Sequence, residues 1–149
     1  MKIAVGSDER GATTDAVIDA LRARGFDVEL YGPLANTPEG SSEQWAAVSE
    51  QVARSVASGD ADKGVLFCWT GTGCSIAANK VDGVRAALCP DAETARGARK
   101  WNDANVLAMS LRLTTPILGR EILDAFLDTD DVDPNERPNI DRLREIEAG

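Results

Sequence analysis

The sequence predicts an α/β fold built around a parallel, doubly wound sheet. Short apolar runs of strand length alternate with stretches that carry apolar residues at helical spacing. Such alternation is typical of successive right-handed βαβ units. The chain has 149 residues, the size of one domain, and its 43% hydrophobic and 28% charged residues are ordinary for a globular protein. We therefore expect a single domain over residues 1–149, with strands at residues 2–7, 27–31, 64–68, 84–88 and 105–109.

A helix is predicted between the first two strands. The apolar run of residues 2–7 ends in a polar turn, and Thr13 or Thr14 is suited to cap a helix over residues 15–24. Gly25 would end this helix, because glycine is common just beyond a helix C-terminus.

The middle of the chain continues the alternation. Residues 32–42 are rich in Pro, Gly, Asn and Ser and predict a loop. A helix over residues 43–58 follows, with valines near helical spacing. Further helices are expected at residues 75–80, 91–101 and 116–127, the last with a proline in its first turn.

Residues 128–149 form an acidic linker followed by a tail helix, predicted over residues 139–147. Little room is left for this helix on its own sheet. We therefore expect it to reach a neighbouring subunit in a homodimer or tetramer.

The composition excludes several classes of function. A net charge of −9 argues against nucleic acid and anionic membranes as partners, because both favour a basic surface. The chain has no histidine, so histidine metal sites, Ser-His-Asp triads and Cys-His pairs are excluded. Proton transfer must then use Cys, Asp, Glu, Lys or water. Three cysteines without a signal peptide or transmembrane run indicate a cytoplasmic protein with free thiols.

Residues 64–80 carry the strongest functional signal. A buried strand over residues 64–68 leads into a glycine loop and a helix start. This order brings together the Cys68 thiol, the Thr70 hydroxyl and the backbone amides around Gly71 and Gly73. Parallel sheets bind ligands at the carboxyl ends of their strands, and helix starts offer unpaired N–H groups to anions. These are the parts of an acid–base enzyme that acts on an anionic substrate.

Other interpretations of this loop are possible. A dinucleotide fingerprint would need a third glycine where Ile76 stands, and a phosphate-binding Walker loop would need a Lys-Ser or Lys-Thr ending. The glycines could also serve only a tight turn. Cys68 and Cys74 compete for the role of reactive thiol, whereas Cys89 is expected to pack in the core.

Three further side chains are candidates for substrate contacts. Asp8 follows the first strand and would share a rim with Cys68, although it could instead cap a helix. Asn102 would bind a substrate hydroxyl or close a turn, and Arg112 would bind a phosphate or face solvent. Trp45 and Trp69 are expected to pack.

The run from Cys68 to Lys80, CWTGTGCSIAANK, closely resembles the signature of the ribose-5-phosphate isomerase B and galactose-6-phosphate isomerase family. Residues 6–8, 83–86 and 102–108 support the resemblance, which is collinear over residues 2–127. It implies a three-layer α/β/α sandwich with a five-stranded, parallel, Rossmann-like sheet. The strands would be ordered second, first, third, fifth, fourth. It also implies a dimer with sites at the interface, and aldose–ketose isomerisation of a sugar phosphate through a cis-enediolate without metal or cofactor.

The resemblance also implies roles for individual residues. Cys68 matches the base of one branch of the family, and Cys74 stands where another branch has a glutamate base. The Thr70 hydroxyl and the amides near Gly71 and Gly73 match the groups that stabilise the enediolate oxygen. The substrate-binding positions are those of Asp8, Glu9, Ser75, Trp101, Asn102 and Arg112, with Arg137 and Arg142 as the nearest counterparts of phosphate-binding arginines from a neighbouring subunit.

The departures from the family pattern concern ring opening. Glu9 and Trp101 replace two histidines, and Trp45 replaces a tyrosine. Tryptophan has no titrating nitrogen, so Trp101 cannot open a furanose ring as an acid or base. An acyclic tetrose phosphate needs no such group. The alternative functions are a non-catalytic or heteromeric sugar-phosphate-binding subunit, and a thiol-redox or nucleotide-binding module, against which the missing C-x-x-C counts.

Overall fold

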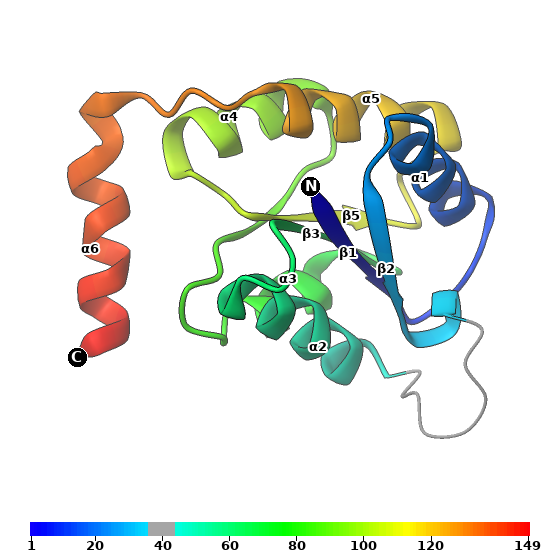
Figure 1. Cartoon of the computed structure of the whole chain (residues 1–149), viewed down its shortest axis with the longest axis horizontal. Coiled ribbons are helices and arrows are strands. Elements are labelled where there is room, and N and C mark those ends of the chain that lie inside the picture. The colour runs from blue at the N-terminus through cyan, green and yellow to red at the C-terminus, as the bar shows by residue number, and fades with distance from the viewer. Residues whose placement is uncertain (36–43) are drawn as a thin grey trace.

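The computed structural model describes residues 1–35 and 44–149 and shows a three-layer α/β/α sandwich (Figure 1). All strand pairs in the sheet are parallel, in the order β2-β1-β3-β5-β4. The fold class and the strand order expected from the sequence are therefore confirmed. The strands are β1 (Lys2–Ser7), β2 (Asp27–Tyr31), β3 (Lys63–Cys68), β4 (Ala86–Leu88) and β5 (Val106–Ser110).

Helices cover both faces of the sheet (Figure 1). One apolar core lies between the sheet and helices α1 (Ala12–Ala23), α4 (Ala92–Asn102) and α5 (Pro116–Asp128). The second core lies under α2 (Trp45–Ser58) and α3 (Thr72–Ala78). The central strands β3 and β5 are buried on both faces, as expected for strands that helices cover from both sides.

The helix starts show where local side-chain chemistry decides the boundaries. Gly11, and not Thr13 or Thr14, is the N-cap of α1, so the predicted cap is wrong. The Thr14 hydroxyl accepts the Gly11 N–H at 3.0 Å, which lets the helix begin three residues earlier than predicted. Asp91 caps α4 by accepting the Thr94 N–H at 2.7 Å, close to the predicted start.

Residues 36–42 of the predicted loop, and Glu43 at the predicted start of the second helix, lie outside the described residues. Before them, Gly32–Ala35 forms a short 3-10 turn. A second 3-10 turn, Pro134–Glu136, lies in the acidic segment before the tail helix.

The tail helix α6 (Arg137–Ala148) stands apart from the sandwich, beyond the amino ends of the strands (Figure 1). Its one buried residue is Ile140, and Glu147 accepts a hydrogen bond of 3.0 Å from the Gly83 amide. Leu143 and Ile146 remain exposed. The helix is longer than predicted, and α5 extends by one residue into the predicted linker.

Candidate active site

The carboxyl edge of the sheet brings several of the predicted side chains together. In the parallel register, Ser7 pairs with Phe67 and Cys68 pairs with Ser110, so β1, β3 and β5 end side by side. A pocket of about 260 Å³ opens at this edge, and its lining residues are Asp8, Trp45, Cys68, Trp69, Thr70, Thr72 and Gly73. Thr72 was not singled out from the sequence, although its hydroxyl lies 2.7 Å from that of Thr70.

The loop after β3 needs glycine at position 71, and the glycine at position 73 makes room for the Trp45 ring. Gly71 has φ +77°, and a Cβ there would lie 2.4 Å from Leu88 and 3.0 Å from the Met109 backbone. A Cβ on Gly73 would lie 3.0 Å from the Trp45 ring. The loop therefore turns tightly into α3, and the N–H groups of this first turn have no acceptor inside the helix. The N–H of the half-buried Ser75 is the first that does have one, because it donates to the Gly71 carbonyl at 3.3 Å.

The neighbours of Cys68 favour its thiolate form. Its sulfur accepts the Cys74 backbone N–H at 3.4 Å. The nearby Cys74 thiol is the largest influence and, with this N–H, lowers the pKa of Cys68 to about 6, against the opposing effect of burial. The thiolate is the nucleophilic and basic form of cysteine, so Cys68 is largely in its reactive form at neutral pH.

Cys74 has the opposite character. It is fully buried, and its thiol donates to the Gly71 carbonyl at 3.3 Å. The hydrogen bond with Cys68, reinforced by burial, raises the pKa of Cys74. Cys89 is also fully buried, and burial raises its pKa to about 12. Of the three thiols, Cys68 is the one with the properties of a base.

Asp8 places a carboxylate on the same rim. Its Oδ1 atom is buried and has no hydrogen-bond partner among the described residues. Burial is the largest influence and raises the pKa of Asp8, with the neighbouring Glu9 adding to the effect. A buried carboxylate oxygen without a partner is costly, so this atom is suited to receive a substrate hydroxyl. The side chain of Glu9 itself is exposed.

Arg112 lies on this rim as well. Its backbone N–H donates to the Trp69 carbonyl at 2.9 Å, which joins the segment after β5 to the loop after β3. Its side chain is exposed, and among residues 1–35 and 44–149 it has no ion-pair partner. Trp45 and Trp69 were expected to pack, but they are 45% and 55% exposed and border the pocket, so that expectation is wrong.

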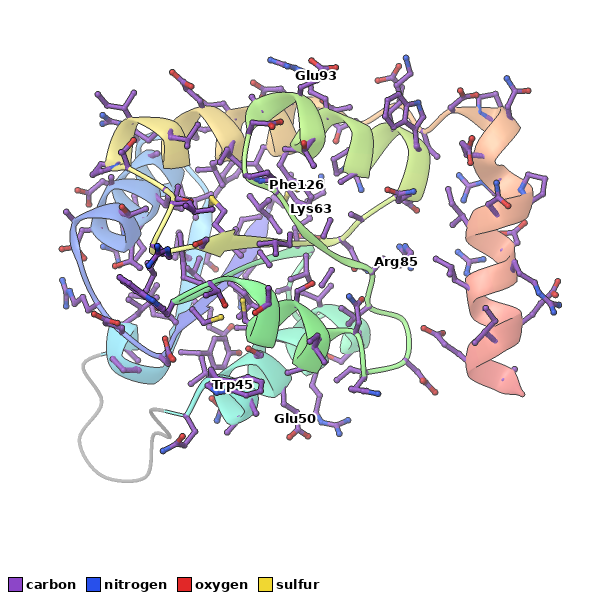
Figure 2. All side chains as sticks on the ribbon, turned by 180° about the vertical axis from the view of Figure 1, so that it is seen from behind. Trp45, Glu50, Lys63, Arg85, Glu93 and Phe126 are labelled. Carbon is purple, nitrogen blue, oxygen red and sulfur yellow. The ribbon has the colours of Figure 1, made fainter. Side chains whose placement is uncertain are left out.

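The remaining predicted residues lie at the opposite edge of the sheet. Trp101 and Asn102 end α4 and precede β5, whose first residue pairs with Gly64 at the amino end of β3. Strands rise about 3.3 Å per residue, so this edge is roughly 15 Å from the Cys68 rim. Figure 2 shows the two ends, with Trp45 near one and Arg85 near the other, towards α6. Arg137 and Arg142 belong to α6, where Arg142 pairs with Glu145 at 2.5 Å.

The described residues show neither a metal-binding cluster nor a membrane-spanning helix. Within residues 1–35 and 44–149, no group of three or more Cys, Asp or Glu side chains is placed to hold a metal ion. The helices in the same part of the chain are each too short or too polar to cross a bilayer.

A parallel α/β fold that brings a cysteine with a lowered pKa and an unpaired carboxylate oxygen to one rim has the parts of an acid–base enzyme for small polar substrates. The sequence model described as ribose/galactose isomerase matches residues 3–145. The chain is 34% identical to the ribose-5-P isomerase B of Listeria innocua over 99% of this chain and 97% of that protein. The chain therefore belongs to the ribose/galactose isomerase family, as the sequence indicated.

Two more relatives extend the comparison. The D-erythrulose-4-phosphate isomerase of Pectobacterium atrosepticum is 33% identical, over 96% of this chain and 93% of that protein. The structure of ribose-5-phosphate isomerase B from Mycoplasma genitalium with bound ribulose-5-phosphate has a TM-score of 0.85 and 32% identity, covering 99% of this chain and 96% of the other. The predicted enzyme class, an aldose–ketose isomerase of sugar phosphates, is confirmed.

Proposed function

We propose that this isomerase interconverts the aldose and ketose forms of a short, acyclic sugar phosphate, with Cys68 as the base. The observation that carries the proposal is the state of Cys68. Its sulfur lies in the rim pocket, accepts a backbone N–H at 3.4 Å, and has a pKa lowered to about 6 by the Cys74 thiol. A base with a pKa slightly below neutral pH is both deprotonated and strong enough to take a proton next to a carbonyl.

The chemistry proceeds by proton transfer. The Cys68 thiolate removes the proton from C2 of the aldose, and negative charge moves onto the carbonyl oxygen at C1. The Thr70 hydroxyl and the amides of Gly71 and Gly73 are the proposed donors to this oxygen, and such a donor contributes about 3–4 kcal/mol to catalysis. Return of the proton to C1, with transfer of the O2 proton to O1, gives the ketose.

Cys74 supports this step without exchanging protons with the substrate. A thiolate is a stronger acceptor than a backbone carbonyl, so the Cys74 thiol turns towards Cys68 once Cys68 is charged. Asp8 is the proposed ligand of a sugar hydroxyl, because its buried Oδ1 lacks a partner. Ser75, in the first turn of α3, is proposed to bind the substrate from the same side.

The size of the substrate follows from the tryptophans and from the absence of histidine. The Trp45 ring lies against Gly73 and narrows a pocket of about 260 Å³. Position 9 is an exposed glutamate, position 101 a tryptophan, and the chain contains no histidine to open a furanose ring. A tetrose 4-phosphate cannot close such a ring, because its terminal hydroxyl carries the phosphate. The relative named for D-erythrulose 4-phosphate supports this substrate class.

The phosphate site is proposed to need a second copy of the chain. Arg112 on the rim would bind one side of the phosphate through its planar guanidinium. Trp101, Asn102, Arg137 and Arg142 would come from the amino edge and α6 of a neighbour in a homodimer or tetramer. The half-exposed Trp101 and the exposed Leu143 and Ile146 of α6 support such an interface.

Each chain would then act as one domain, residues 1–149, with the segment from residue 128 reaching its partner. The three free cysteines support a reducing, cytoplasmic setting.

The test is a panel of tetrose, pentose and hexose phosphates assayed with the purified protein. We expect kcat/KM for a tetrulose 4-phosphate to exceed that for ribose 5-phosphate by at least about tenfold, or 1.4 kcal/mol. A tenfold preference for ribose 5-phosphate would refute the acyclic substrate. Tight binding of a sugar phosphate with no turnover of any substrate would instead indicate the binding-subunit function.

A further inference from the structure

The turn after Asn102 has an unusual backbone. Asp103 has φ 48° and ψ 44°, and it is the one non-glycine residue with a positive φ among residues 1–35 and 44–149. A left-handed conformation at a residue with a side chain costs on the order of 1 kcal/mol. Glycine adopts this conformation without the steric cost, and Gly59 does so at the end of α2. The Asp103 carboxylate supplies contacts that a glycine at this position could not make.

That carboxylate joins two arginines. Its Oδ1 atom accepts from Nη1 of Arg99 at 3.0 Å, and Oδ2 lies 3.5 Å from Nη2 of Arg85. The Asp103 carbonyl accepts from Nε of Arg85 at 2.7 Å. Arg99 is only 6% exposed, and a buried guanidinium is tolerated only where its N–H groups have partners. The turn is thus held by side chains from both sides.

Arg99 also holds the chain that leads to α6. Its Nε donates to the Thr129 carbonyl at 3.0 Å, and its guanidinium lies 5.8 Å from the centre of the Phe126 ring. One residue further, the Lys100 carbonyl accepts the Asp133 N–H at 2.7 Å. The end of α4 and the segment between α5 and α6 are therefore tied together at two points.

We propose that Arg99 and Asp103 are positioning residues that hold Trp101, Asn102 and the chain leading to Arg137 as one preformed half-site for a partner's pocket. This inference rests on the proposed cross-subunit site. Neither residue touches substrate. Arg99, itself bound by Asp103, ties the end of α4 to Thr129 on the segment that leads to α6, although Arg99 and Thr129 are 30 positions apart in sequence.

Arg99 and Asp103 would affect catalysis by keeping Asn102 in the right orientation towards the substrate in the partner's pocket. A displacement of about 1 Å in a group that orients substrate lowers turnover by up to about a hundredfold. Loss of the Asp103 carboxylate would release the turn that carries Asn102 and leave the Cys68 rim of the same chain unchanged. The rim and the half-site are at opposite edges of the sheet, so the two can be tested separately.

The test uses Asp103→Gly, which removes the carboxylate and relieves the left-handed backbone, while Arg99 keeps its hydrogen bonds to the Thr129 and Ala104 carbonyls. Thermal unfolding of the variant is measured alongside its activity. We expect kcat at 25 °C to fall by about tenfold or more while the pH at which activity rises stays the same. Asp103→Asn, which tolerates this backbone and keeps a hydrogen-bonding oxygen, should recover part of the activity. Wild-type kcat in Asp103→Gly would overturn the positioning role.

A subunit-mixing experiment separates this inference from the function on which it rests. Cys68→Ala and Asp103→Gly chains are co-expressed with different tags and assayed as a mixture. If each site combines one rim with a neighbour's half-site, random pairing restores about a quarter of the wild-type activity. The control mixture combines Cys68→Ala with Asn102→Ala.

The outcomes are distinct. Recovery in both mixtures supports the inference. Recovery in the Asn102 mixture alone would show that Asp103 does not act through the partner's site and would overturn the inference, leaving the shared site intact. Recovery in neither mixture would overturn the cross-subunit site and the inference with it.

Discussion

Replacement of Cys74 by alanine removes the group that most strongly lowers the pKa of Cys68. The Cys74 backbone N–H, 3.4 Å from the Cys68 sulfur, remains in place. The substitution therefore weakens the stabilisation of the thiolate without removing all of it. In the proposed mechanism the Cys68 thiolate is the active form, so activity should rise with pH through the pKa of Cys68, and that rise should move to higher pH in the variant.

The size of the shift follows from the strength of the lost bond. A hydrogen bond to a charged acceptor is worth about 1.5 kcal/mol, which corresponds to about one pH unit. With a pKa of about 6, roughly nine-tenths of Cys68 is ionised at pH 7. With a pKa near 7, about half is ionised. We therefore expect about a twofold loss of kcat/KM at pH 7 and almost none at pH 9.

The assay is the pH dependence of kcat/KM between pH 5 and pH 9, followed in parallel by the rate of alkylation with iodoacetamide. Cys74→Ser is the matched control, because its hydroxyl can still donate to the thiolate and the profile should stay near that of the wild type. Cys89→Ala controls for the loss of a buried thiol away from the pocket. An unmoved profile in Cys74→Ala, or an equal shift in Cys74→Ser, would refute the role of Cys74 as donor.

Three other substitutions test separate parts of the account. Arg112→Lys should raise KM for a phosphorylated substrate about tenfold, because lysine loses the planar fork; equal binding of a sugar and its phosphate by the wild type would contradict this. Trp45→Ala should widen the pocket and improve kcat/KM for pentose relative to tetrose phosphates; an unchanged ratio in the substrate panel would count against it. Phe126→Ala, fully buried in the core, should lower the free energy of unfolding by about 3–5 kcal/mol in urea denaturation, and a loss below about 1 kcal/mol would not fit the packing.

The order of strands and helices was predictable because hydrophobic period and turn residues are local properties. The exact first and last residues of the helices are harder to predict from the sequence. The start of α1 depends on the reciprocal contact between Gly11 and Thr14, which no single cap residue reveals. Helix α3 begins at Thr72, before the predicted Ser75, because Gly71 adopts a positive φ that turns the chain early.

The candidate site was predicted in part. Cys68, Thr70 and Asp8 meet at one pocket, as the ends of parallel strands require. Trp69 does not pack as predicted, because it follows the last residue of β3 and so lies beyond the core. The position of Asn102 at the amino edge of the sheet is predictable from the sequence, because this residue precedes β5. The network around Arg99 and Asp103 is not predictable from the sequence, because it also joins Arg99 to Thr129, a residue far away in the chain.

The measurement that tests the central claim most directly is exchange of the C2 proton of an aldose phosphate with solvent in D₂O, followed by NMR. The wild-type protein should incorporate deuterium at C2 as it turns over a tetrose 4-phosphate. Cys68→Ala should lose at least about a hundredfold in this rate, while thermal unfolding and phosphate binding stay close to those of the wild type. Exchange at the wild-type rate in Cys68→Ala would contradict the assignment of Cys68 as the base.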